Sequence, residues 1–150
     1  MATFHFRLAT LLRLREATRD DRRAQLAEAQ YAEQMIVERI AALDAELAES
    51  QRRSLDAARP GRVNIDRLTD GTRYEMILKV ERQTADQQRQ AVADEVRKRR
   101  EALVAADRDV KVLEKLRETQ TEQHREKEAR QEFKRLDEIA VVRHATREAS

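Results

Sequence analysis

The chain has 150 residues, of which 40% are charged and only 3% are aromatic. So few large aromatic side chains argue against the compact core of a globular domain. The formal net charge is +2, from 31 basic and 29 acidic residues, which lacks the strong basic bias of a bulk nucleic-acid binder. The chain contains no cysteine, so disulfides and thiolate metal sites are excluded as well.

No apolar run approaches the roughly 18 residues of a membrane span, so we expect no membrane insertion. The first residues carry charge inside their apolar stretch and lack a small-residue cleavage site, which is unlike a secretory signal. The expected location is therefore the cytoplasm.

The first long helix is predicted over about residues 4–58. Its apolar residues fall into two interleaved seven-residue series with the 3-4 spacing of a coiled-coil seam, namely Leu12, Leu26, Ile40 and Leu47, and Leu8, Ala29, Ile36 and Leu43. Arginine occupies the same frame earlier, at Arg15, Arg19 and Arg22. Two interpretations stay open there: the N-terminal part is unpaired within its own chain, or the arginine stems lie along the groove and reach water.

A turn is predicted over residues 59–71, because this window holds the only proline and both glycines, Pro60, Gly61 and Gly71. The second helix is then predicted to begin at Thr72, which with Glu75 fits a capping box. A start at Asn64, with Gly71 tolerated inside the helix, is the alternative.

The second helix is predicted over about residues 72–144. Its seam is formed by Val96, Leu103 and Val110 in one series and by Val92, Ala106 and Leu113 in the other, with Arg99 as an interruption. After Leu116 the chain is polar up to Glu132 apart from Ala129, and apolar residues return in a shifted frame at Phe133, Leu136, Ile139 and Ala140. This helix should extend past the first one, so the aromatic N-terminus and the apolar C-terminal residues are expected at the same tip.

These patterns predict an all-α protein, a long antiparallel two-helix coiled-coil hairpin that forms a single domain over residues 1–150. Full disorder is rejected because the apolar residues are regularly spaced.

Catalytic, cofactor and metal sites are not expected. There is no phosphate-binding loop, and His5, His124 and His144 are far apart in the sequence. His124 has glutamates at 122, 126 and 128, but a solvated helix face is favoured over a metal site. Because a two-helix hairpin offers no pocket in which carboxylates are desolvated, we expect no enzyme activity.

One basic cluster, Arg97-Lys98-Arg99-Arg100, is a candidate for nucleic-acid or acidic-partner binding. Asp94, Glu95 and Glu101 offset its charge, so a solvated face is again favoured and no nucleic-acid partner is expected.

Two stretches resemble the family of the flagellar export protein FliJ, a coiled-coil component of the type III export apparatus. The first is similar to the family's opening pattern, Phe4-His5-Phe6-Arg7-Leu8 followed by Leu11-Leu12 and Arg15-Glu16. The second is similar to its closing pattern, Leu113-Glu114-Lys115-Leu116-Arg117-Glu118 followed by Leu136-Asp137-Glu138-Ile139-Ala140. Arg99 and the Pro60-Gly61 turn depart from the family pattern.

The resemblance implies a non-enzymatic stalk that associates with the ring of the flagellar export ATPase and promotes its assembly and activity. It also implies contacts with the export gate protein and with export chaperones, at the cytoplasmic face of the inner membrane. The implied contact residues for the ATPase ring are Phe4, Phe6, Leu8, Leu11, Arg13, Arg15, Leu116, Phe133, Leu136 and Asp137. A related injectisome component, and a generic coiled-coil scaffold or homodimer, remain open alternatives.

Overall fold

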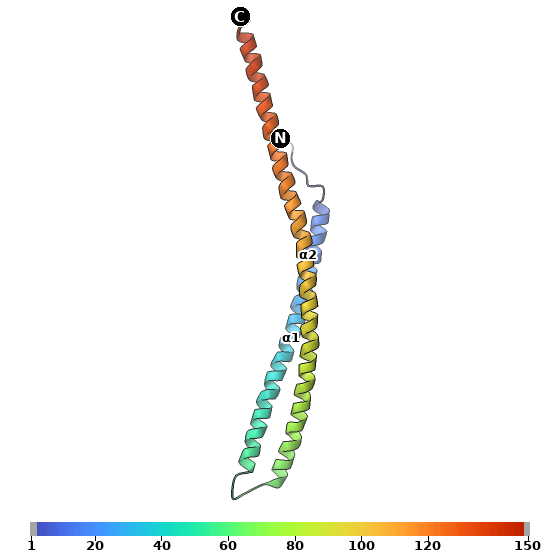
Figure 1. Cartoon of the computed structure of the whole chain (residues 1–150), viewed down its shortest axis with the longest axis vertical. Helices are drawn as coiled ribbons and strands as arrows, with labels where there is room; N and C mark the ends of the chain where they lie inside the picture. The colour runs from blue at the N-terminus through green and yellow to red at the C-terminus, as the bar shows by residue number, and fades with distance from the viewer. Residues whose placement is uncertain (1–2, 149–150) are drawn as a thin grey trace. The chain divides into compact units, whose positions relative to one another are not determined.

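The computed structural model describes residues 3–148 and contains two long helices, α1 (Ala9–Ala57) and α2 (Ile65–Glu148). The helices run antiparallel and pack against each other, and no strand occurs within residues 3–148 (Figure 1). The predicted all-α, two-helix hairpin is therefore confirmed.

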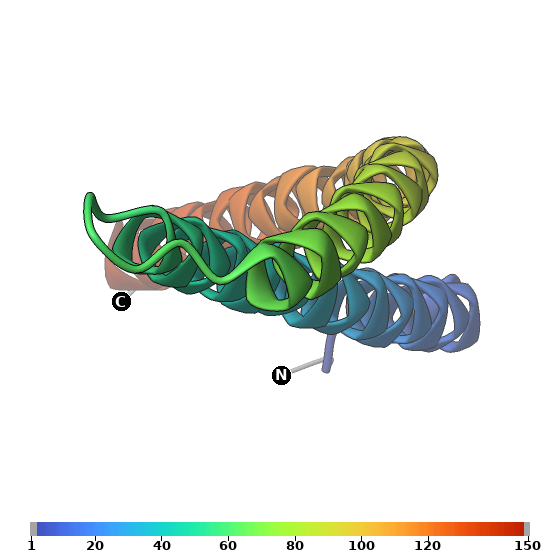
Figure 2. The same ribbon diagram turned by 90° about the horizontal axis from the view of Figure 1, so that it is seen from below.

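The turn between the helices is shorter than predicted. Pro60 and Gly61 lie in it, and Gly61 has a φ of 103°, a left-handed conformation that glycine adopts without steric cost. The side-chain oxygen of Asn64 accepts a hydrogen bond from the Arg67 N–H at 3.1 Å, which is the contact of a helix N-cap. In Figure 2 the loop (green) crosses from the end of α1 to the start of α2.

The predicted start of the second helix at Thr72 is wrong, and the alternative start at Asn64 agrees with the structure. The Thr72 hydroxyl donates to the Leu68 carbonyl at 2.8 Å, as a threonine inside a helix does. Glu75 instead accepts a hydrogen bond from Ser54 on α1 at 3.1 Å. The first helix also begins later than predicted, at Ala9, and the second continues to Glu148.

Gly71 lies inside α2, where the sequence favoured a break. A Cβ atom at this position would lie 2.8 Å from the Ser54 hydroxyl oxygen. The missing side chain therefore lets α1 and α2 approach closely beside the turn. The cost of glycine in a helix interior, about 1 kcal/mol, is small enough for such packing to offset.

The contacts divide the chain into two units. Within the described residues, the turn unit comprises residues 20–104, and the terminal unit comprises residues 3–19 and 105–148. The assignment of residues 1–150 to a single domain stays a prediction.

The core of the turn unit consists of two apolar clusters along the helix seam. One contains Leu26, Ala29 and Val96, and the other contains Leu43, Leu78 and Ala85. Leu43, only 1% exposed, is the most deeply buried of these. The predicted seam series are thus largely confirmed, although Leu78 and Ala85 were not among the predicted residues.

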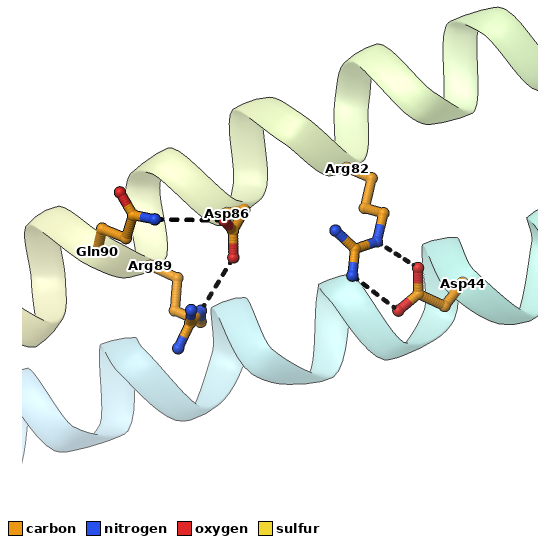
Figure 3. Close-up of polar contacts among 5 residues, drawn as sticks. All are labelled: Asp44, Arg82, Asp86, Arg89 and Gln90. Atoms are coloured by element: carbon orange, nitrogen blue, oxygen red, sulfur yellow. Dashed lines mark hydrogen bonds and ion pairs between the residues drawn. The ribbon is translucent and has the colours of Figure 1, made fainter.

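Ion pairs join the two helices along the edges of this seam. Arg82 of α2 reaches Asp44 of α1, with its Nε at 2.5 Å and its Nη2 at 3.5 Å from the two carboxylate oxygens (Figure 3). Arg39 of α1 pairs with Glu81 of α2 through a single contact, from its Nη2 to a carboxylate oxygen at 2.9 Å. The hydrogen bond to Asp44 raises the pKa of Arg82 above its ordinary value. Because these side chains are about half exposed, the pairs guide register more than they add stability.

Candidate partner-binding surface in the terminal unit

The first residues of the terminal unit fold back onto α2. The Ala9 N–H donates to the Phe6 carbonyl at 3.2 Å, and the Phe6 ring is only 7% exposed. It packs in one cluster with Leu12, Val110 and Leu113. Phe6, one of the implied ring contacts, is therefore an internal packing residue of the terminal unit.

Phe4 is partly buried against the same cluster. Its ring lies 5.6 Å, centroid to centroid, from the His124 ring, at an interplanar angle of 42°. The Nε2 atom of His124 also lies 3.5 Å from a Glu128 carboxylate oxygen. Phe4 thus holds the N-terminal segment against α2.

Leu8 was predicted to belong to the seam, but it is partly exposed, at 37%. Arg15 and Asp109 form an ion pair of 3.5 Å between the two helices. Leu8 lies seven residues before Arg15, and Leu116 lies seven residues after Asp109. The two leucines therefore continue the same edge of the helix pair toward the chain ends. Leu11 is exposed to a similar degree, so the terminal unit presents a small apolar edge made by Leu8, Leu11 and Leu116.

The arginines of this region have different surroundings. The Arg15 side chain lies along the seam edge and pairs with Asp109, which favours the interpretation of an arginine stem along the groove. Arg13 is exposed and lines a shallow hollow together with Phe4 and Phe6.

The C-terminal segment, residues 129–147, has only exposed side chains. Phe133 is 73% exposed and Leu136 is 61% exposed, and Asp137 forms no ion pair with any residue in the range 3–148. In Figure 1 this part of α2 (orange to red) runs on past the beginning of α1. The predicted extension of the second helix beyond the first is present in the terminal unit.

Phe133 and Leu136 do not continue the seam. Seven-residue steps from Val110 and Leu113 lead to positions 131, 134, 138 and 141, and these positions would face α1 if it were longer. At about 100° per residue, Phe133 and Leu136 lie on the opposite side of α2. The N-terminal aromatic residues and the Phe133–Leu136 face therefore lie on opposite sides of one helix.

The four consecutive residues Ile139, Ala140, Val141 and Val142 are a feature that the sequence interpretation did not use in full. Because successive residues are about 100° apart, these four side chains cover the whole circumference of α2. All four are exposed. A helix that is apolar all round is normally buried all round. The four consecutive apolar residues in the sequence were the signal that could have identified this segment as a contact surface.

Ionisable groups with shifted pKa values are not tuned for proton transfer near neutral pH. A hydrogen bond from Arg52 lowers the pKa of Glu49, and a hydrogen bond to Glu46 raises the pKa of Tyr74. Both shifts move the pKa away from neutrality, whereas a general acid or base works best with a pKa near the operating pH.

Metal ligands do not gather anywhere in residues 3–148, where no group of three or more suitable side chains converges. In the basic cluster, Arg97 pairs with Asp94 and Glu101 on its own helix, and Arg99 reaches into the seam. The four cations therefore do not form one basic face. No helix within the described range has the length and apolarity needed to cross a membrane.

These features define a class of protein, the two-helix coiled-coil hairpins with exposed apolar side chains. Residues 4–149 match the family model described as Flagellar FliJ protein. The chain therefore belongs to the FliJ family and is a flagellar export-associated coiled-coil protein. Searches among curated proteins and among solved structures found no match.

Proposed function

We propose that this protein is a non-enzymatic stalk and adaptor of the flagellar type III export apparatus. It associates with the ring of the export ATPase and promotes the assembly and activity of that ring. It works in the cytoplasm, peripherally at the inner membrane, and contacts the export gate protein and export chaperones. Membership of the FliJ family supports a role in the flagellar export apparatus. The ATPase, the export gate protein and the chaperones are the partners that we propose.

The observation that carries the proposal is the run Ile139–Val142. Its apolar side chains point in all directions around α2, and all of them are exposed. A flat partner would cover one side of this helix and leave the others in water. A ring that encloses the helix would cover all of them, so this segment suits the lumen of an ATPase ring.

The proposed contact residues have a graded role. Phe133, Leu136 and the run Ile139–Val142 insert as the leading apolar segment, with Asp137 beside them. Leu8, Leu11, Leu116 and Arg13 form a second contact closer to the helix pair. Phe4, Phe6 and Arg15 contribute by holding the end of the pair together.

The test is ATP hydrolysis by the flagellar export ATPase with and without this protein. We expect stimulation by the native chain and loss of stimulation with Phe133→Gln combined with Leu136→Gln, since glutamine keeps the helix and removes the apolar face. The matched control is Leu55→Gln with Val80→Gln, two exposed apolar residues of the turn unit, which should leave stimulation intact.

Three outcomes would contradict the proposal. These are absence of stimulation with an active ATPase, equal loss in the control variant, and a chain that sediments as a stable dimer through the Phe133–Leu136 face. The last result would favour the homodimeric scaffold. Export gate and chaperone contacts are tested separately, by co-purification of each partner with the native chain.

A further inference from the structure

Arg99 occupies a seam position of α2. It follows Leu78, Ala85 and Val92 at intervals of seven residues, and Leu78 and Ala85 are buried while Val92 is partly buried. Its neighbours Val96 and Leu103 also pack in the seam. A guanidinium therefore replaces an apolar side chain in the middle of an otherwise apolar row.

The Arg99 side chain makes specific contacts with α1. Its Nη1 donates to the backbone carbonyl of Gln25 at 2.7 Å and lies 3.5 Å from a Glu28 carboxylate oxygen. Its Nε donates to Glu95 on its own helix at 2.8 Å. The side chain is 30% exposed, so it lies along the groove with its charge satisfied by two helices.

Of these contacts, the one with the Glu28 carboxylate depends on the register of the two helices, because any residue of α1 offers a backbone carbonyl. A slip of one heptad would place Ala32 and Met35, or Thr18 and Asp21, where Gln25 and Glu28 now lie. The first slip removes the carboxylate partner, and the second offers only a shorter one. A charged group at the seam that loses its partner is costly, so Arg99 disfavours both slips.

A second consequence concerns pairing between two copies of α2. In a parallel, in-register pair, residues at the same seam position face each other. Two Arg99 side chains would then meet without the Gln25 carbonyl or the Glu28 carboxylate. Like charges facing each other in a seam act against such a pair.

We infer that Arg99 selects the partner and the register of α2: it fixes the hairpin with α1 and prevents α2 from pairing with a second copy of this chain. Replacement by leucine completes the apolar row Leu78–Ala85–Val92, and the completed row is competent for self-association. Arg99 thereby lowers the affinity of α2 for a second copy of α2. In return, the seam has one apolar residue fewer.

The test uses the full chain, which has no cysteine of its own. In a parallel pair of α2 helices, a cysteine at position 92 faces its counterpart and forms an intermolecular disulfide under mild oxidation. We expect Val92→Cys alone to give little covalent dimer, and Val92→Cys with Arg99→Leu to give about tenfold more, because one polar seam residue can decide the oligomeric state. The readout is a non-reducing gel, with the mass of Arg99→Leu from light scattering.

The matched control is Arg97→Leu, which removes the same charge from an exposed position two residues away. Val92→Cys with Arg97→Leu should behave like Val92→Cys alone. A second measurement uses Ala29→Cys with Val96→Cys, a pair buried in one cluster, whose intrachain disulfide should form readily and fall severalfold in yield when Arg99→Leu is added.

Equal dimer yields for the Arg99 and Arg97 variants, with an unchanged intrachain disulfide, would overturn the inference. If Arg99→Leu does not fold, Arg99→Gln takes its place, because it removes the charge and keeps a polar side chain. A monomeric Arg99→Gln with the native disulfide pattern would overturn the inference equally.

Discussion

The seam of the turn unit and the C-terminal segment 129–147 both lie on helices that are rich in charged residues, yet they place apolar residues differently. In the seam, apolar residues recur every seven positions and are buried, as at Leu43 and Leu78. In the C-terminal segment they are crowded into a few turns and exposed, as at Phe133 and Val141. The spacing of apolar residues thus separates a segment that stabilises the fold from one that is available to a partner.

The largest expected difference comes from leucine-to-alanine changes in the two regions. Leu43→Ala should lower the free energy of unfolding by about 3 kcal/mol, because it opens a cavity in a cluster of the seam. Leu136→Ala should change it by less than about 0.5 kcal/mol, because its side chain is exposed. Denaturant titrations followed by far-UV circular dichroism compare the two, and equal effects would break the comparison.

A second pair of variants sharpens the comparison between the two aromatic parts of the terminal unit. Phe6→Ala should cost about 2 kcal/mol, less than at a central core site because the residue packs near a helix end. Phe133→Ala should leave the melting temperature almost unchanged. If Phe6→Ala also has no effect on thermal unfolding, the folded-back N-terminal segment does not contribute to stability.

A smaller effect is expected at the turn. Asn64→Ala should cost about 1 kcal/mol through loss of the N-cap hydrogen bond. Asn64→Asp retains a capping oxygen and serves as the control. An effect of the same size from both variants would show that the side-chain oxygen is not what stabilises the start of α2.

The smallest effect is expected for the ion pair between Arg82 and Asp44. A double-mutant cycle with Arg82→Ala and Asp44→Ala should give only a weak coupling, because both groups are exposed to water, which screens their charges. The coupling should fall further as salt is raised. A coupling that is large and insensitive to salt would contradict this assignment.

The helical hairpin and most of its seam were predictable because seven-residue spacing depends on local sequence alone. Leu26 and Leu43 were predicted and are buried. Gly71 was predicted to be a helix break. The cost of glycine inside α2 is offset by the close approach of Ser54 from the other helix. Such a compensation is tertiary and leaves no local signal.

The candidate site was less predictable. Phe6 and Phe133 are both aromatic residues near a chain end, and sequence reasoning gave both the same role. One packs against Val110 and the other is exposed, because the N-terminal segment folds back over α2. The direction of that fold depends on long-range contacts, which a single sequence does not reveal.

The unpaired end of α2 also has a consequence for hydrogen exchange. The backbone amides of residues 129–147 are protected by helical hydrogen bonds alone, and an isolated helix of this length is marginal in water. These amides should therefore exchange with solvent far faster than those beside Leu43, which exchange only when the seam opens. A partner that encloses Ile139–Val142 would slow their exchange, so deuterium uptake along α2 would map the extent of the enclosed segment.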